Sequence, residues 1–154
     1  GHMVIKKDGI PCNCGRKGCF EVYASTTALI REAEEAAGRC PDSVLARLKE
    51  GNGRLDGVKI FQAINQEDAC ALQVFDTYTS DLASGIGSLI NIFNPQIFVI
   101  GGGLSGEGER LLAPIRKKVE AQIYCGHLAM PEIRAAMLKN DAGIVGAAAL
   151  GAYQ

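Results

Sequence analysis

Three cysteines lie close together near the start of the chain, in a segment that also contains a histidine. Cys12, Cys14 and Cys19 follow the spacing C-x-C-x4-C, and His2 precedes the first of them by ten residues. One imidazole and three thiolates make a tetrahedral set of four ligands, which suits a structural zinc ion and leaves no position for water or substrate. The pattern therefore predicts a zinc site formed by His2, Cys12, Cys14 and Cys19.

Other interpretations of these residues stay open. The spacing differs from the standard zinc-finger patterns, so three reduced thiols in a loop, or a disulfide, would also account for it. The other cysteines, Cys40, Cys70 and Cys125, are far apart in helix-like or apolar surroundings, and this distribution favours a metal site over a disulfide framework. Gly1-His2-Met3 has the form of a remnant of cleavage and cloning, which would make His2 foreign to the natural chain.

A second candidate site is a glycine-rich turn in the last third of the chain. Gly101, Gly103 and Gly106 satisfy the pattern G-x-G-x-x-G between an apolar strand and a helix. A dinucleotide-binding domain would have this unit early, with an acidic residue about 20 positions later, and neither condition is met. Two interpretations remain: the glycine backbone contacts adenosine or the phosphates of a nucleotide, or the turn packs the strand against the helix.

The elements that position these loops follow from apolar periodicity and turn residues. Residues 67–93 have apolar side chains at spacings of three and four and end before Pro95, which predicts a long buried helix. A short apolar strand at 96–100 enters the glycine turn. The order strand, helix, strand, helix predicts a parallel pair in an α/β layer. Further elements are expected as helices at 20–37 (stopped by Gly38), 42–50, 56–65, 106–124 and 140–152 (capped by Asn140-Asp141), and as a strand at 132–137.

Length and composition limit the class of protein. The chain of 154 residues, 47% of them hydrophobic, is long enough for one compact domain with a single core, so 1–154 is expected to be one domain. A net charge of -1 gives no clustered positive charge for nucleic acid or an anionic membrane, and a neutral small molecule fits better. Without an apolar run of roughly 20 residues or a secretory leader, a soluble cytoplasmic protein is expected.

Three segments of the chain resemble the ROK family of sugar kinases and sugar-responsive repressors. They are Gly1-His2 with CNCGRKGCFE at 12–21, IFVIGGGLS at 97–105, and KNDAGIVGAA at 139–148, in the order in which the family has them. In this family a histidine ten residues before the first cysteine completes a zinc site, and Gly-His-Met commonly precedes the cysteines, so His2 is kept as a ligand. The resemblance runs essentially from end to end. It implies the C-terminal half of an actin-like, ribonuclease H-like ATPase fold, helix-dominated, with a small parallel sheet and a zinc-binding loop.

The resemblance also implies roles for individual residues. The same histidine and the glutamate two residues beyond the last cysteine contact the sugar, which here means His2 and Glu21. Without the resemblance, a single exposed glutamate near a helix start, such as Glu21, is more often a charge partner of the helix N-terminus. The backbone of Gly101, Gly102 and Gly103 would approach ATP. Asp141 would cap the last helix or lie on the nucleotide side.

The implied activity is that of an ATP-dependent hexose kinase, glucokinase-like, with magnesium accompanying ATP. The family's catalytic Asp lies before the zinc segment, so we expect the N-terminal domain to be absent and this fragment to be inactive alone. An N-acetylhexosamine or fructose kinase, a repressor, and a zinc-stabilised structural module stay open. Because an incomplete sheet should leave an apolar face uncovered, and family members are commonly homodimers, a homodimer is expected.

Overall fold

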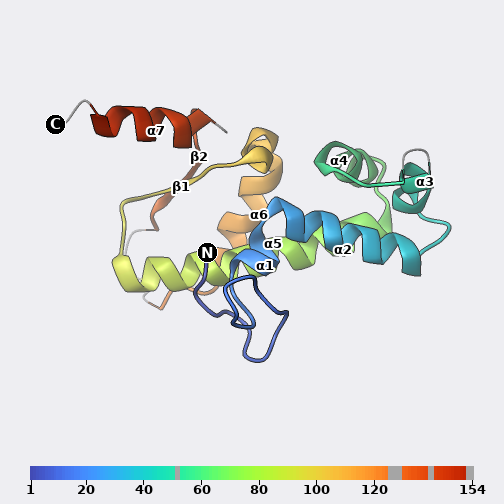
Figure 1. The fold of residues 1–154 in the computed structure, drawn as a ribbon, viewed down its shortest axis with the longest axis horizontal. Helices are drawn as coiled ribbons and strands as arrows, with labels where there is room; N and C mark the ends of the chain where they lie inside the picture. The colour runs from blue at the N-terminus through green and yellow to red at the C-terminus, as the bar shows by residue number, and fades with distance from the viewer. Residues whose placement is uncertain (51–52, 125–129, 139–140, 152–154) are drawn as a thin grey trace. The chain divides into compact units, whose positions relative to one another are not determined.

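The computed structural model describes residues 1–50, 53–124, 130–138 and 141–151 (Figure 1). The chain divides into two compact units, Gly1–Gly85 and Ile86–Gln154. The long helix α5, Ala69–Phe93, contributes to both units. Within the described residues, no helix combines the length and apolar character that a membrane crossing requires.

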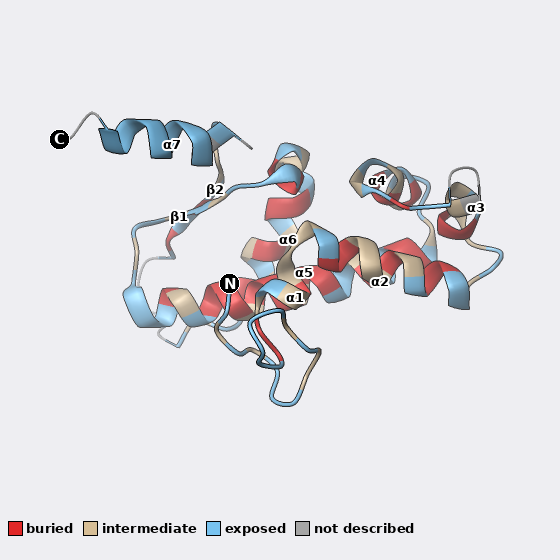
Figure 2. Ribbon diagram, in the orientation of Figure 1, coloured by how far each residue is buried: buried red, intermediate tan, exposed pale blue. Residues whose placement is uncertain are grey.

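The first unit is a helical packing that carries the cysteine loop at its N-terminal end. Buried residues recur along its helices (Figure 2), and Leu29, Leu45 and Ile60 are fully buried. Phe61 packs edge-on against Phe75, with 5.4 Å between ring centroids. Besides the beginning of α5, its helices are α1 Glu21–Ala24, α2 Thr26–Arg39, α3 Val44–Glu50 and α4 Gly57–Asn65.

The second unit contains the small sheet. Strands β1 (Ile97–Ile100) and β2 (Glu132–Ala135) are parallel, in the register Ile97 with Glu132 and Ile100 with Ala135, which confirms the predicted parallel pair. The 3-10 helix Gly103–Glu107 and the helix α6, Glu109–Glu120, connect them. A parallel pair needs such a crossover, because its strands run in the same direction. The helix α7, Ala142–Leu150, follows β2.

Four local predictions were wrong or incomplete. Residues 20–37 form two helices, because Ser25 is extended (ψ 160°) and its hydroxyl accepts a hydrogen bond from the Ala28 amide, which starts α2. Gly38 lies inside α2 and does not stop it. The helix expected at 106–124 is shorter and follows a 3-10 turn. Asp141 precedes α7 without a capping hydrogen bond from its side chain, and Asn140, like Cys125, lies outside the described residues.

Candidate metal and sugar site

The knuckle loop, residues 1–21, is held by backbone hydrogen bonds between its two arms. Val4 forms an isolated antiparallel bridge with Cys19, and Pro11 forms another with Lys17. The Gly18 amide donates to the Ile10 carbonyl (2.9 Å), and the Ile5 amide donates to the Gly18 carbonyl (2.9 Å). These bonds fold the segment twice and bring distant sulfur atoms to one place.

Gly18 is the residue that lets the two arms approach. Its φ is +75°, a conformation that side chains rarely adopt, and an added Cβ would lie only 1.6 Å from the Lys6 carbonyl oxygen. Gly15, at the tip of the loop, has a φ of +86° but open space around it. Glycine is therefore required by close packing at one position and by backbone conformation at the other.

The four predicted metal ligands come together in this loop. Their ligand atoms all lie within 4.8 Å of one another, with 3.6 Å between Cys12 Sγ and His2 Nδ1 and 3.5 Å between Cys14 Sγ and Cys19 Sγ. A tetrahedral ion about 2.3 Å from each sulfur and about 2.0 Å from nitrogen would separate its ligands by roughly 3.5–3.8 Å. The arrangement therefore fits a zinc-sized ion.

Two cysteines of the cluster have pKa values shifted in opposite directions. The pKa of Cys14 is lowered to about 6, first by the backbone amide of Arg16 and then by its guanidinium. The pKa of Cys19, which is fully buried, is raised to about 11 by desolvation and by the neighbouring thiols. Arg16 also donates to the His2 carbonyl oxygen at 2.7 Å, so one cation holds both ends of the ligand set.

The two nitrogens of His2 face different partners. Nδ1 points to Cys12, as above, whereas Nε2 lies 3.4 Å from Glu21 Oε2. Glu21 begins α1, and its side chain is half exposed, as is that of His2. One imidazole thus joins the metal cluster to a carboxylate that is open to solvent, where a polar ligand can be bound.

An ion pair that the sequence analysis missed, between an exposed lysine and a buried aspartate, fastens the knuckle loop to α5. Lys6 Nζ lies 2.8 Å from the buried Asp81 carboxylate and 4.3 Å from the centre of the Tyr23 ring. The Tyr23 hydroxyl accepts a hydrogen bond from the Ile10 amide at 2.7 Å. The separation of 75 residues between Lys6 and Asp81 is why no local pattern indicated the pair.

The glycine turn lies in the second unit, directly after β1. Gly102 has a φ of +97°, and its carbonyl accepts hydrogen bonds from both the amide (3.0 Å) and the hydroxyl (2.7 Å) of Ser105. Gly101, Gly102 and Gly103 are exposed, and a Cβ added at Gly102 or Gly103 would meet nothing within 4 Å. The turn is therefore open, as a surface that meets a ligand must be.

Together these features define a helix-rich α/β protein with a small parallel sheet, a Cys3His loop and an open glycine turn. The ROK family model matches residues 1–153, and the chain belongs to the ROK family. It is 39% identical over 150 residues to a glucokinase of Thermotoga maritima, covering 97% of this chain and 47% of that protein.

A solved structure and a repressor complete the comparison. The crystal structure of a ROK family glucokinase from Streptomyces griseus in complex with glucose and AMPPNP superposes with a TM-score of 0.87 at 37% identity, covering 97% of this chain and 49% of that one. The structure accordingly matches the actin-like ATPase fold of ROK kinases. The xylose repressor of Bacillus subtilis is 26% identical over 124 residues, covering 80% of this chain and 28% of that protein. This chain spans about half the length of the kinases it matches.

Proposed function

We propose that this chain supplies the sugar-side knuckle and the nucleotide-side glycine turn of an ATP-dependent hexose kinase, with glucose as the first candidate substrate. The observation that carries the proposal is the orientation of His2, whose ring faces the cysteine cluster with one nitrogen and the Glu21 carboxylate with the other. The similarity to glucokinases, one of them crystallised with glucose and AMPPNP, supports the choice of substrates.

On the sugar side, Glu21 and His2 would both contact the sugar. A carboxylate accepts hydrogen bonds from two adjacent hydroxyls, which is the pattern that a hexose presents. A structural zinc ion held by His2, Cys12, Cys14 and Cys19 would fix the loop, and the backbone bonds around Gly18 already restrict it. The chain's own residues thereby bind and orient the sugar.

On the nucleotide side, we assign Gly101, Gly102 and Gly103 to contact with ATP, because a backbone free of side chains can approach adenosine or phosphate closely. Magnesium bound with ATP would supply charge neutralisation at the phosphates. We place the catalytic base in the part of the relatives that this chain does not span, so the isolated chain is expected to bind ligands without transferring phosphate.

A second candidate is the sugar-binding part of a repressor. Its support is the similarity to the xylose repressor, at an identity lower than that to the glucokinase. The two functions differ in the nucleotide requirement, because only a kinase consumes ATP. Coupled measurement of ATP consumption by the full-length protein with glucose, N-acetylglucosamine and fructose separates them and ranks the sugars.

The direct test of the site is glucose binding, measured by calorimetry on the full-length protein that carries this chain. Glu21→Gln should weaken binding roughly 10- to 100-fold, because a charged acceptor for sugar hydroxyls is lost. Glu120→Gln, at the exposed end of α6, removes the same charge elsewhere and should bind glucose as the wild type does. Equal affinities in both variants would remove Glu21 from the sugar site.

We further propose a cytoplasmic homodimer. Cytoplasmic location follows from the need for ATP, and self-association from the apolar surface of the second unit. Phe93, Ile144 and Leu150 are each more than 70% exposed in this structure, and Met137 is 97% exposed.

A further inference from the structure

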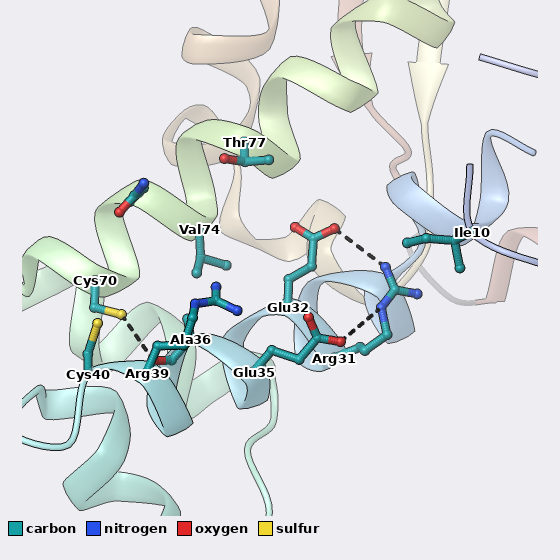
Figure 3. A pocket seen from close by; sticks show the side chains of 11 residues that line it. Ile10, Arg31, Glu32, Glu35, Ala36, Arg39, Cys40, Cys70, Val74 and Thr77 are labelled. Atoms are coloured by element: carbon teal, nitrogen blue, oxygen red, sulfur yellow. Dashed lines mark hydrogen bonds and ion pairs between the residues drawn. The ribbon is translucent and has the colours of Figure 1, made fainter. Parts of the chain in front are cut away.

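A second group of cysteines lies in the first unit, at a pocket to which the knuckle loop contributes Ile10. The pocket has a volume of about 330 Å³ and lies between α2 and the first turns of α5. Cys40 and Cys70 line it, together with charged residues of both signs that include Arg39 and Glu35. Figure 3 shows the two sulfur atoms side by side at one end of the pocket.

One carbonyl group accepts a hydrogen bond from each of these cysteines. The Ala36 oxygen, in the last turn of α2, accepts a hydrogen bond from the Cys40 amide at 2.9 Å. The same oxygen accepts a second bond from the Cys70 thiol at 3.5 Å. Both residues are therefore held against a single atom, although 30 positions separate them in sequence.

One carboxylate holds the segments on which the cysteines lie. Asp68 accepts a hydrogen bond from the Val44 amide at the start of α3 (2.7 Å) and another from the Ala71 amide in the first turn of α5 (2.7 Å). The turn after Cys40 is closed in addition by Ser43, whose hydroxyl donates to the Cys40 carbonyl at 2.6 Å. The backbone on both sides of the pair is thus ordered before any reaction occurs.

The two thiols differ in their access to solvent. Cys40 is half-buried and adjoins the exposed Arg39, whereas Cys70 is only 9% exposed. Burial raises the pKa of Cys70 to about 12, and the contact with Cys40 and the charge of Asp68 act in the same direction. Because Cys40 is the more exposed of the two, it is the one that a molecule from solution reaches first.

We propose that Cys40 and Cys70 form a dithiol modification site, at which a small disulfide such as glutathione disulfide enters the pocket and leaves the two cysteines joined. Both residues are free thiols in the structure described here. The charged lining residues of both signs suit a small zwitterionic peptide.

The reaction consists of two exchanges. The Cys40 thiolate attacks one sulfur of glutathione disulfide, the glutathione S–S bond breaks, and the departing glutathione thiolate takes up the proton that Cys40 has lost. Cys70 then gives up its proton, and its sulfur attacks Cys40 Sγ and displaces the second glutathione as a thiol. In total two protein thiols are oxidised by two electrons to one disulfide, and one glutathione disulfide is reduced to two thiols.

The test treats the native protein with glutathione disulfide and maps the cysteines by peptide mass spectrometry. We expect a Cys40–Cys70 linked peptide in the wild type, and a Cys40–glutathione adduct that accumulates in Cys70→Ser because no second thiol can displace it. In Cys40→Ser, Cys70 should remain unmodified. The oxidised wild type should also unfold at a temperature higher by on the order of 10 °C, a shift that both serine variants lack.

Three outcomes would overturn the proposal. They are a wild type in which neither cysteine reacts, a wild type in which the glutathione adduct on Cys40 persists, and linkage of Cys40 or Cys70 to a knuckle cysteine instead. In Cys70→Ser the smaller hydroxyl can donate to the same Ala36 oxygen. In Cys40→Ser the backbone amide keeps its bond to that oxygen, so both variants are expected to fold. Their circular dichroism spectra serve as the control.

Discussion

Gly15 and Gly18 lie in one loop and both have a positive φ, but only Gly18 is closely packed. Substituting each in turn therefore separates the effect of packing from that of backbone conformation. Gly18→Ala would force a Cβ into the Lys6 carbonyl, so the knuckle must open. We expect the free energy of unfolding to fall by about 3 kcal/mol or more. In Gly15→Ala only the backbone conformation is unfavourable, so the free energy of unfolding should fall by about 1 kcal/mol. Urea unfolding measures both, and similar losses would contradict the close packing described here.

Cys19 is the buried member of the cluster and the sharpest probe of the metal. We expect elemental analysis to give about one zinc per chain, and Cys19→Ser to lose it, because one thiolate of the tetrahedral set is removed. Cys40→Ser removes a cysteine outside the cluster and should retain the metal. A metal-free wild type that is well folded would leave the thiols as structural residues only.

At the scale of elements, α5 carries a buried tyrosine whose ionisation can be followed. The Tyr78 hydroxyl donates to the Ala24 carbonyl at 2.9 Å, and burial raises the pKa of Tyr78 well above its ordinary value of 10. Below about pH 10 the phenol is protonated in both the folded and the unfolded chain, so it adds no pH dependence. Above that pH only the unfolded chain ionises, and stability falls as the pH rises.

Tyr78→Phe removes this alkaline loss. At neutral pH the variant should be less stable by about 1 kcal/mol, because the hydrogen bond to Ala24 is gone. Between about pH 10 and 11 the stability of the wild type should fall more steeply, by up to about 1.4 kcal/mol per pH unit. Denaturant unfolding at several pH values measures the difference. Parallel curves would mean that the phenol ionises inside the folded protein.

The elements found from the sequence are those whose residues repeat with a period. Apolar spacing located α5 to within two residues at its start, and the apolar run before the glycine turn located β1. The break at Ser25 was missed because one capping side chain outweighs the helical propensity around it. Gly38 was read as the stop, but α2 continues for one more residue, to Arg39, because a single glycine costs a helix only about 1 kcal/mol.

The candidate site was predictable to the extent that its residues are close in sequence. The cysteine spacing indicated the knuckle, and the structure brings all four ligands together. The contacts of Lys6 with Asp81 and of Cys40 with Cys70 depend on packing between segments that are distant in sequence. No pattern in a single sequence reports such contacts, because they arise only when the whole unit has folded.

At the scale of the whole molecule, the exposed apolar residues of α7 predict self-association. Sedimentation velocity should show a dimer, and Ile144→Glu should shift it towards monomer, because a charge cannot be buried in an apolar contact without a large cost. Val58→Glu is the matched control, since Val58 is 78% exposed and Ile144 is 72% exposed. A wild type that stays monomeric at high concentration would count against the homodimer.

The orientation of the His2 ring also determines the direction of hydrogen bonds in the proposed sugar site. When Nδ1 serves as a metal ligand, the neutral ring carries its proton on Nε2, so only one tautomer is left. Nε2 is then a donor, whereas ionised Glu21 is only an acceptor. A hydroxyl group that meets both would accept from the histidine through its oxygen and donate its hydrogen to the glutamate. The pair would therefore select a group that both accepts and donates a hydrogen bond. A sugar with hydrogen or fluorine in place of that hydroxyl would not bind there.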